Sequence, residues 1–188
     1  MYLIAGLGNP ENAYKWTRHN AGFEVINKLA YDNFIDVKTH KWRAHLGKGK
    51  IGGERVLLAK PTTYMNLSGE SIAQIMDYNE IPIEKLIIIH DEIALDLGVV
   101  RIKYSGGHGG HNGIANVMHC LGSNDFLRLR LGIGARPPKM KLANYVVSKF
   151  LPAEHDDIVI GITRAAEAIE HMLSEGVDRA MNVYNQKV

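Results

Sequence analysis

The 188-residue sequence has one cysteine and no long apolar run. A single cysteine, Cys120, excludes an internal disulfide and is typical of a protein in a reducing cytoplasm. No apolar stretch approaches the roughly 20 residues that cross a bilayer, so no membrane association is expected. The first residues lack the basic start and the small-residue cleavage site of a signal peptide. Together these absences predict a cytoplasmic protein.

Motifs of several other enzyme classes are missing or incomplete. There is no Walker phosphate loop and no Gly-x-Ser-x-Gly nucleophile elbow. Residues 6–8 begin a dinucleotide-binding pattern, but Glu11 takes the place of its third glycine. His90, His108 and His111 form an alternative metal set, yet a glycine-rich loop lacks the rigid support that metal ligands normally have. The sequence therefore predicts neither a metal nor a cofactor.

Charge is distributed unevenly along the chain, although the net charge is only +2. Residues 99–149 contain eight Lys or Arg and a single acid, Asp125, whereas residues 150–188 contain three basic residues and seven acids. One interpretation is a solvated face with chance clustering. We favour a surface that binds phosphate groups, because the basic segment also contains a glycine-rich loop.

Segments typical of strands and helices alternate along the chain. Apolar runs bounded by turns predict strands at residues 2–7, 44–51, 54–60, 86–90, 99–104 and 127–133. Amphipathic spacing predicts helices at residues 21–33, 68–78, 112–120 and 152–175. A chain of this length suits one domain with a substantial core. We expect a single α/β domain over residues 1–188, with a mixed, largely parallel twisted sheet covered by helices on both faces.

Polar side chains stand at the ends of several predicted strands. Asn9 follows the first strand, residues 61–66 follow the third, and Asp91 closes the fourth, while His19 lies shortly after the first strand. Sites in open α/β sheets form at the carboxyl ends of strands, so we expect these residues to converge. A histidine base, an acid that orients it, and neutral amides that bind oxygen and nitrogen atoms suit the attack of water on a carbonyl.

Each of these features also has a purely structural interpretation. His19 can pack against or cap the helix that follows it, and Asp91 can cap a turn. Asn66 suits the N-cap of the helix at residues 68–78. Four glycines within residues 106–110 can form only a mobile connection, or they can let the backbone approach a ligand closely.

Six short motifs follow one another along the chain: Gly-Leu-Gly-Asn-Pro at 6–10, Thr-Arg-His-Asn-Ala-Gly at 17–22, Pro-Thr-Thr-Tyr-Met-Asn-Leu-Ser-Gly at 61–69, His-Asp-Glu at 90–92, Gly-His-Gly-Gly-His-Asn-Gly at 107–113, and Arg-Leu-Arg-Leu-Gly-Ile-Gly at 128–134. This set resembles, in order, the motifs of bacterial-type peptidyl-tRNA hydrolases. Glu11 departs from the pattern, since the family usually has glycine there, which alters the turn but removes no functional side chain. The tail matches only in helical character.

The resemblance implies hydrolysis of the ester that joins a peptide to the 3′-terminal ribose of tRNA, without metal or cofactor. It implies His19 as the base that activates water and Asp91 as the acid that orients it. Asn9 corresponds to the residue that discriminates blocked from free aminoacyl groups. On physical grounds, Asn66 and a backbone N–H suit the oxyanion, because neutral donors bind charge without neutralising the base.

The resemblance also implies that the partner is peptidyl-tRNA, bound through its acceptor stem and 3′ end by a monomer that binds no DNA and no membrane. The implied acceptor contacts are Tyr14, Tyr64, Asn66 and Asn112, and the implied phosphate clamp is Lys103 and Arg130. An enzyme that serves all tRNAs must hold them by backbone charge. Two rival functions are an RNA-binding module without catalysis and a hydrolase of small acylated substrates.

Overall fold

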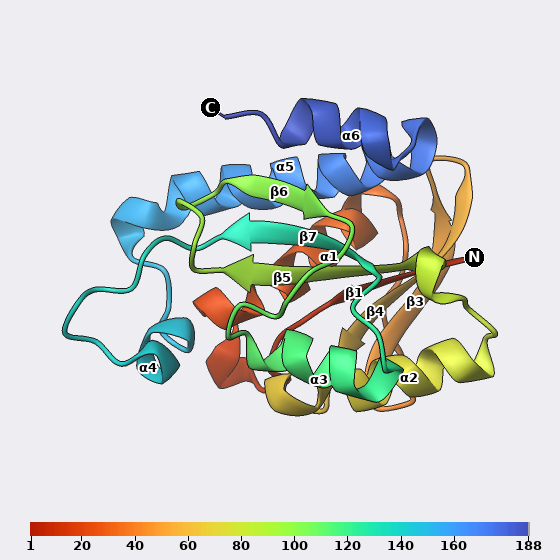
Figure 1. Cartoon of the computed structure of the whole chain (residues 1–188), viewed down its shortest axis with the longest axis horizontal. Coiled ribbons are helices and arrows are strands. Elements are labelled where there is room, and N and C mark those ends of the chain that lie inside the picture. Colours follow the sequence, from red (N-terminus) through yellow and green to blue (C-terminus); the bar gives the residue numbers. More distant parts are fainter. Residues whose placement is uncertain (188) are drawn as a thin grey trace.

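The computed structural model describes residues 1–187, which contain one mixed seven-stranded sheet (Figure 1). The strands are β1 (Tyr2–Gly6), β2 (Thr39–Lys41), β3 (Ala44–Ile51), β4 (Glu54–Pro61), β5 (Leu86–Glu92), β6 (Val100–Lys103) and β7 (Leu127–Gly132). Their order is β2-β3-β4-β1-β5-β7-β6. The central strands β4, β1, β5 and β7 run parallel, and antiparallel neighbours flank them at both edges.

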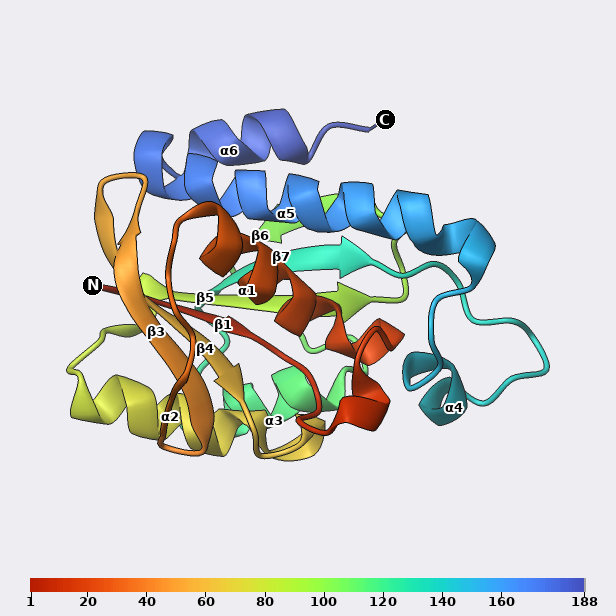
Figure 2. The ribbon, with the colours of Figure 1, turned by 180° about the vertical axis from the view of Figure 1, so that it is seen from behind.

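Helices cover both faces of the sheet, as Figures 1 and 2 show from opposite sides. One face carries α1 (Ala21–Asp32), α5 (His155–Glu175) and α6 (Val177–Tyr184), and the other carries α2 (Ser68–Tyr78) and α3 (Asn112–Leu121). Each set of helices encloses its own buried apolar cluster with the sheet. The predicted fold class is therefore confirmed. No helix within residues 1–187 has the length and apolar character needed to cross a membrane.

The apolar pattern explains the buried faces of these elements. Residues 86–89 are buried, as expected for a central parallel strand that is covered on both sides. The predicted apolar stripe of α5 is buried throughout: Ile158, Ile162, Ala165, Ile169, Met172 and Leu173. The chain enters this helix through a turn of 3-10 helix at Pro152–Glu154, where proline suits the first turn.

Three elements were not predicted: β2, α6 and the short helix α4 (Leu142–Val146). All three residues of β2 are exposed, so the strand has no apolar alternation. Helix α4 buries only Tyr145, and α6 buries only Ala180 and Tyr184. Such short or mostly polar segments depend on tertiary contacts, because their own residue pattern is too weak to identify them.

A close approach of backbone to backbone brings the His19 turn onto the sheet. His19 lies in the 3-10 turn Arg18–Asn20, which leads directly into α1. A Cβ atom on Gly22 would stand 2.5 Å from the carbonyl oxygen of Ile89 and 2.6 Å from the backbone nitrogen of Leu7. Any side chain at Gly22 would therefore push this turn away from the ends of β1 and β5.

Candidate active site

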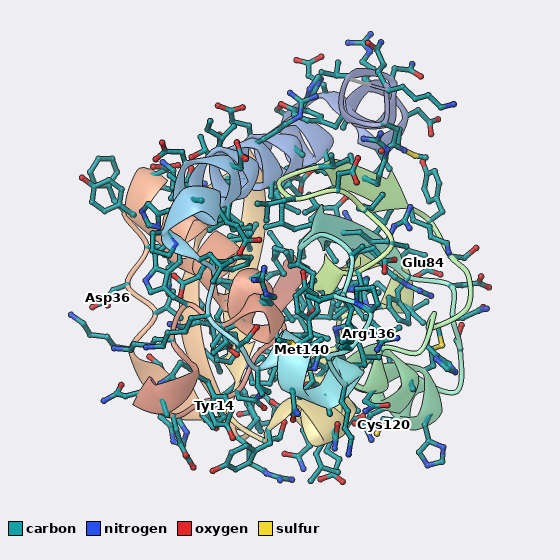
Figure 3. All side chains as sticks on the ribbon, turned by 90° about the vertical axis from the view of Figure 1, so that its left-hand side faces the viewer. Tyr14, Asp36, Glu84, Cys120, Arg136 and Met140 are labelled. Atoms are coloured by element: carbon teal, nitrogen blue, oxygen red, sulfur yellow. The ribbon has the colours of Figure 1, made fainter. Side chains whose placement is uncertain are left out.

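The polar segments that follow β1, β4 and β5 meet at one edge of the sheet. In Figure 1 this is the left side, where the arrowhead of β5 lies, and Figure 3 looks onto it with Tyr14 and Met140 labelled. The backbone N–H of Met65 donates to Oδ1 of Asn9 at 2.8 Å, which joins the segment after β4 to the end of β1. Asp91, near the end of β5, contacts His19. The convergence expected from the polar residues at the strand ends is confirmed.

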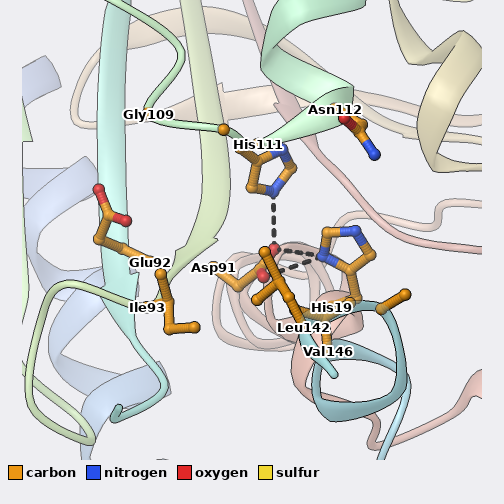
Figure 4. Close-up of a pocket in the computed structure, with 11 residues that line it drawn as sticks. His19, Asp91, Glu92, Ile93, Gly109, His111, Asn112, Leu142 and Val146 are labelled. Carbon is orange, nitrogen blue, oxygen red and sulfur yellow. Dashed lines mark hydrogen bonds and ion pairs between the residues drawn. The ribbon is translucent and has the colours of Figure 1, made fainter. Parts of the chain in front are cut away.

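His19 and Asp91 form a hydrogen-bonded pair in the wall of a cavity of about 350 Å³ (Figure 4). Nδ1 of His19 lies 2.9 Å from Oδ2 and 3.0 Å from Oδ1 of Asp91. An ionised carboxylate can only accept, so Nδ1 carries the proton and Nε2 keeps its lone pair. Asp91 therefore does not cap a turn, and His19 has one nitrogen available as a base.

His111 is a second histidine on the same carboxylate, and the sequence did not identify it as part of the catalytic set. Its Nε2 lies 2.8 Å from Oδ1 of Asp91, and the centroids of the His111 and His19 rings are 4.9 Å apart (Figure 4). Its Nδ1 accepts the backbone N–H of Ile114 at 3.3 Å, because His111 is the N-cap of α3. This bond leaves the proton on Nε2, so Asp91 accepts one N–H from each imidazole.

The electrostatics of the three groups are consistent with these bonds. Burial alone would lower the pKa of His19, but the charge and hydrogen bond of Asp91 outweigh it and raise the pKa above its usual value. Burial alone would raise the pKa of Asp91, but His19 and His111 hold it well below its usual range. The two histidines therefore favour the ionised form of Asp91, and His19 is a stronger base than a free imidazole.

His90, the residue before Asp91, contacts both Asp91 and His111. Burial lowers the pKa of His90 to about 3, so the ring is neutral. Its Nδ1–H donates to the backbone oxygen of Asp91 at 2.8 Å, and its ring meets that of His111 edge-on with centroids 4.9 Å apart. Its Nε2 is buried without a hydrogen-bond partner among residues 1–187. His90 thus packs the second histidine against Asp91.

Asn9 is held by three hydrogen bonds that involve its backbone and its side-chain oxygen. Its N–H donates to Oδ1 of Asn20 at 2.8 Å, and Nδ2 of Asn20 donates back to its carbonyl at 2.9 Å. Its own Oδ1 accepts from Met65, which orients the amide. In the described part of the chain Nδ2 of Asn9 has no partner, so it remains available to a ligand. Asn20 is a supporting residue that the sequence did not identify.

The two remaining asparagines are exposed near this edge. Asn66 lies in the 3-10 turn Met65–Leu67, and the N-cap of α2 is Leu67, so the interpretation of Asn66 as an N-cap is wrong. Asn112 is the first residue of α3 and lines the cavity beside His111. Neither side chain is engaged in a hydrogen bond within residues 1–187. Both amides are therefore free to meet a substrate.

The two tyrosines lie on neighbouring short turns. Tyr14 ends the 3-10 turn Asn12–Tyr14 and is half-buried. Tyr64 is exposed and has φ of +63°, and its hydroxyl donates to the carboxylate of Glu11. The residue that departs from the family pattern therefore adds a link between the segments that follow β1 and β4.

Lys103 and Arg130 share the basic face of β6 and β7 and do not line the cavity. Nη1 of Arg130 lies 3.3 Å from Oε1 of Glu92, and Lys103 packs against Gly106. Between them lies Arg128, which is buried and donates to the carbonyls of the glycine-rich loop. Lys103 and Arg130 are only partly buried, so their charges can reach a ligand.

The metal set considered from the sequence does not form. His90 is buried and bonded to a backbone carbonyl, and Nδ1 of His108 accepts from the N–H of Gly110. The group whose ligand atoms do lie together, within 4.8 Å, is His19, Asp91 and His111. Metal-binding histidines donate their second N–H to an acceptor, whereas Nδ1 of His111 accepts an N–H. The surroundings therefore suit a shared proton network better than a metal ion.

Comparisons with known proteins agree with this geometry. The family model described as Peptidyl-tRNA hydrolase matches residues 3–188. The peptidyl-tRNA hydrolase of Lachnoclostridium phytofermentans is 47% identical over 187 residues, which cover 100% of this chain and 98% of that protein. That of Lachnospira eligens is 45% identical over 185 residues, with 98% and 100% covered. The crystal structure of peptidyl-tRNA hydrolase from Acinetobacter baumannii superposes with a TM-score of 0.90 at 39% identity, covering 97% of this chain and 93% of that one. The chain belongs to the peptidyl-tRNA hydrolase family.

Proposed function

We propose that this peptidyl-tRNA hydrolase cleaves the ester between peptide and 3′-terminal ribose with His19 as the general base and Asp91 as the group that orients it. Family membership supports the reaction. The observation that carries the mechanism is the His19–Asp91 pair, 2.9 Å apart beside an open cavity. We also propose that residues 1–188 act as one hydrolase domain, as a monomer in the cytoplasm, and that released tRNA and peptide are recycled after ribosomal drop-off.

The mechanism needs no covalent intermediate. Nε2 of His19 takes a proton from water as the water oxygen attacks the ester carbonyl, and the imidazolium then returns the proton to the departing ribose oxygen. Negative charge develops on the carbonyl oxygen, and we assign its stabilisation to the exposed amide of Asn66 and a backbone N–H. The ribose oxygen leaves as a neutral hydroxyl once it is protonated, so an activated water suffices.

Asn9 is assigned the discrimination between blocked and free aminoacyl groups. Since Met65 fixes its Oδ1, its Nδ2 can donate to the carbonyl oxygen of a peptide bond. A free aminoacyl group presents an ammonium there, which only donates. We expect Asn9→Ala to lose activity on N-blocked substrates and to narrow their advantage over unblocked aminoacyl-tRNA. The ratio of the two kcat/KM values measures this, and an unchanged ratio assigns the discrimination to another residue.

Lys103 and Arg130 are assigned the acceptor-stem phosphate clamp, with Tyr14, Tyr64 and Asn112 as further acceptor contacts. We expect Lys103→Ala and Arg130→Ala to weaken substrate capture more than turnover at saturation, because both residues lie outside the cavity. Each lost contact should flatten the slope of log affinity against log salt by roughly 0.7–0.9. If both variants keep the wild-type salt slope, the tRNA lies on another surface.

One comparison of substrates tests the function as a whole. The enzyme is given an N-acetyl-aminoacyl-tRNA and the same acyl amino acid esterified to adenosine. A peptidyl-tRNA hydrolase should cleave the tRNA ester with a much higher kcat/KM. Equal kcat/KM on both would indicate a hydrolase of small acylated substrates. Binding without cleavage of either would indicate an RNA-binding module.

A further inference from the structure

One wall of the cavity is supplied by a helix that stands away from the sheet. After β7 the chain passes through residues 134–141, nearly all exposed, before it forms α4. Figure 1 shows α4 at the end of this excursion, beyond the carboxyl ends of the strands. Leu142, Ala143 and Val146 of α4 line the cavity opposite the glycine-rich loop (Figure 4). Its position therefore depends on contacts other than sheet packing.

The main contact is made by Arg18, the residue before His19. Its guanidinium is buried and binds Glu154 through two bonds, from Nη1 to Oε2 at 2.9 Å and from Nη2 to Oε1 at 2.7 Å. Its Nε donates to Oγ of Ser148 at 3.2 Å. Its planar group also lies over the rings of Tyr145, at 4.5 Å, and Phe150, at 5.0 Å. Arg18 thus contacts α4 through Tyr145 and the chain that follows α4 through the other partners.

Backbone bonds extend this contact, which we call the Arg18 clasp (Arg18, Tyr145, Ser148, Phe150 and Glu154). The N–H of Arg18 donates to the carbonyl of Ser148 at 3.0 Å. The hydroxyl of Ser148 donates to the carbonyl of Tyr145 at 2.6 Å. Oε1 of Glu154 accepts the N–H of Leu151 at 2.9 Å. The clasp closes the excursion at its base, where the chain returns to α5.

We propose that Arg18 and Glu154 are positioning residues that hold the α4 wall against the His19 turn and thereby set the shape of the substrate cavity. The inference rests on the proposed function of this cavity. Removing the charge of Glu154 leaves the buried guanidinium of Arg18 without its carboxylate, so the clasp should open when Glu154 is changed. The His19–Asp91 pair lies outside the clasp and should stay intact.

Glu154→Gln keeps the size of the side chain and removes its charge. We expect KM for N-acetyl-aminoacyl-tRNA to rise by about 10-fold with a smaller change in kcat, since a displacement of about 1 Å in a substrate-positioning group can cost about 10²-fold. The acid limb of the pH profile should not move. Trypsin should cleave faster after Lys139 and Lys141 in the exposed excursion. Ser148→Ala should show smaller increases in KM and in the rate of trypsin cleavage. This variant serves as the test if Glu154→Gln does not fold.

Glu175→Gln is the matched control, because it breaks an exposed pair with Arg179 at the other end of the same helix. It should leave KM and the trypsin rate unchanged. A lower Tm in Glu154→Gln with wild-type KM and wild-type trypsin cleavage would show that the clasp only stabilises the fold and would overturn the proposal. Absence of hydrolysis by the wild-type enzyme would instead overturn the proposed function, and the trypsin comparison would still decide whether the clasp holds α4.

Discussion

Replacement of His19 by alanine is expected to lower turnover by roughly 10²–10⁴, the usual worth of a positioned general base. The fold should persist, because the 3-10 turn is held by backbone bonds such as Asn20 N–H to Thr17 O at 3.0 Å. Asp91 also keeps one partner in the variant, since His111 still donates to it. Binding of tRNA should persist as well. Single-turnover cleavage and tRNA affinity measure the two properties separately.

His119→Ala is the matched control for this variant. His119 is an exposed histidine near the end of α3, and its loss should change neither turnover nor affinity. A His19→Ala enzyme that turns over within a few-fold of wild type would remove His19 from the mechanism. In that case the only other imidazole that contacts the Asp91 carboxylate, within residues 1–187, is His111.

The fold was largely predictable because its core elements have strong patterns. The apolar run of β5 and the stripe of α5 are long enough to show their period, and Gly52-Gly53 marks the β3–β4 hairpin. The alternation of strands and helices then indicates a largely parallel sheet, because parallel strands need crossover connections that are usually helical. Helix α4 was not predictable, because it has five residues, buries only Tyr145, and contacts residues distant in the sequence such as Arg18.

The residues of the site were easier to find than their connections. Asn9 and Asp91 stand at strand ends and His19 follows the loop after β1, so their position along the chain indicates their convergence. The bond from His111 to Asp91 depends on how α3 begins, and no local pattern shows it. An N-cap usually signals only a helix start. Here the capping bond also decides which nitrogen of His111 faces the carboxylate.

Replacement of Asp91 by asparagine is expected to be at least as damaging as loss of the base. The Asp91 carboxylate raises the pKa of His19, so its removal should lower that pKa. Protonated His19 cannot act as a base, and activity falls as the pH drops through this pKa. The acid limb of kcat/KM should therefore move to lower pH in the variant. A limb that stays in place, or moves to higher pH, would show that another group governs His19.

The plateau of the Asp91→Asn profile should also fall, and the geometry gives the reason. Nε2 of His111 contacts Oδ1 of Asp91 at 2.8 Å, and Nδ1 of His19 lies nearest Oδ2 at 2.9 Å. An asparagine places an NH2 group at one of these two positions. The Ile114 N–H fixes the proton of His111 on Nε2, so the amide oxygen should turn toward His111. The amide N–H group then faces His19 and donates to its Nδ1. Nδ1 can no longer carry the proton of His19, so this proton moves to Nε2, the nitrogen whose lone pair is needed for catalysis. A loss of about 10⁴-fold matches the scale of a base held in the wrong tautomer.

This account makes a prediction that a simple loss of charge does not. In the double variant Asp91→Asn with His111→Ala, nothing holds the amide oxygen away from His19. The side-chain amide of the asparagine can then rotate so that its oxygen accepts the N–H from Nδ1 of His19. This restores the lone pair on Nε2. We expect the plateau of the double variant to exceed that of Asp91→Asn alone by about 10-fold or more, a coupling typical of residues in one hydrogen-bond network. ¹⁵N shifts of the imidazole should show His19 returning to the tautomer with its proton on Nδ1. Equal or lower activity in the double variant, with His19 protonated on Nε2 in both, would refute the role of His111 in setting the tautomer.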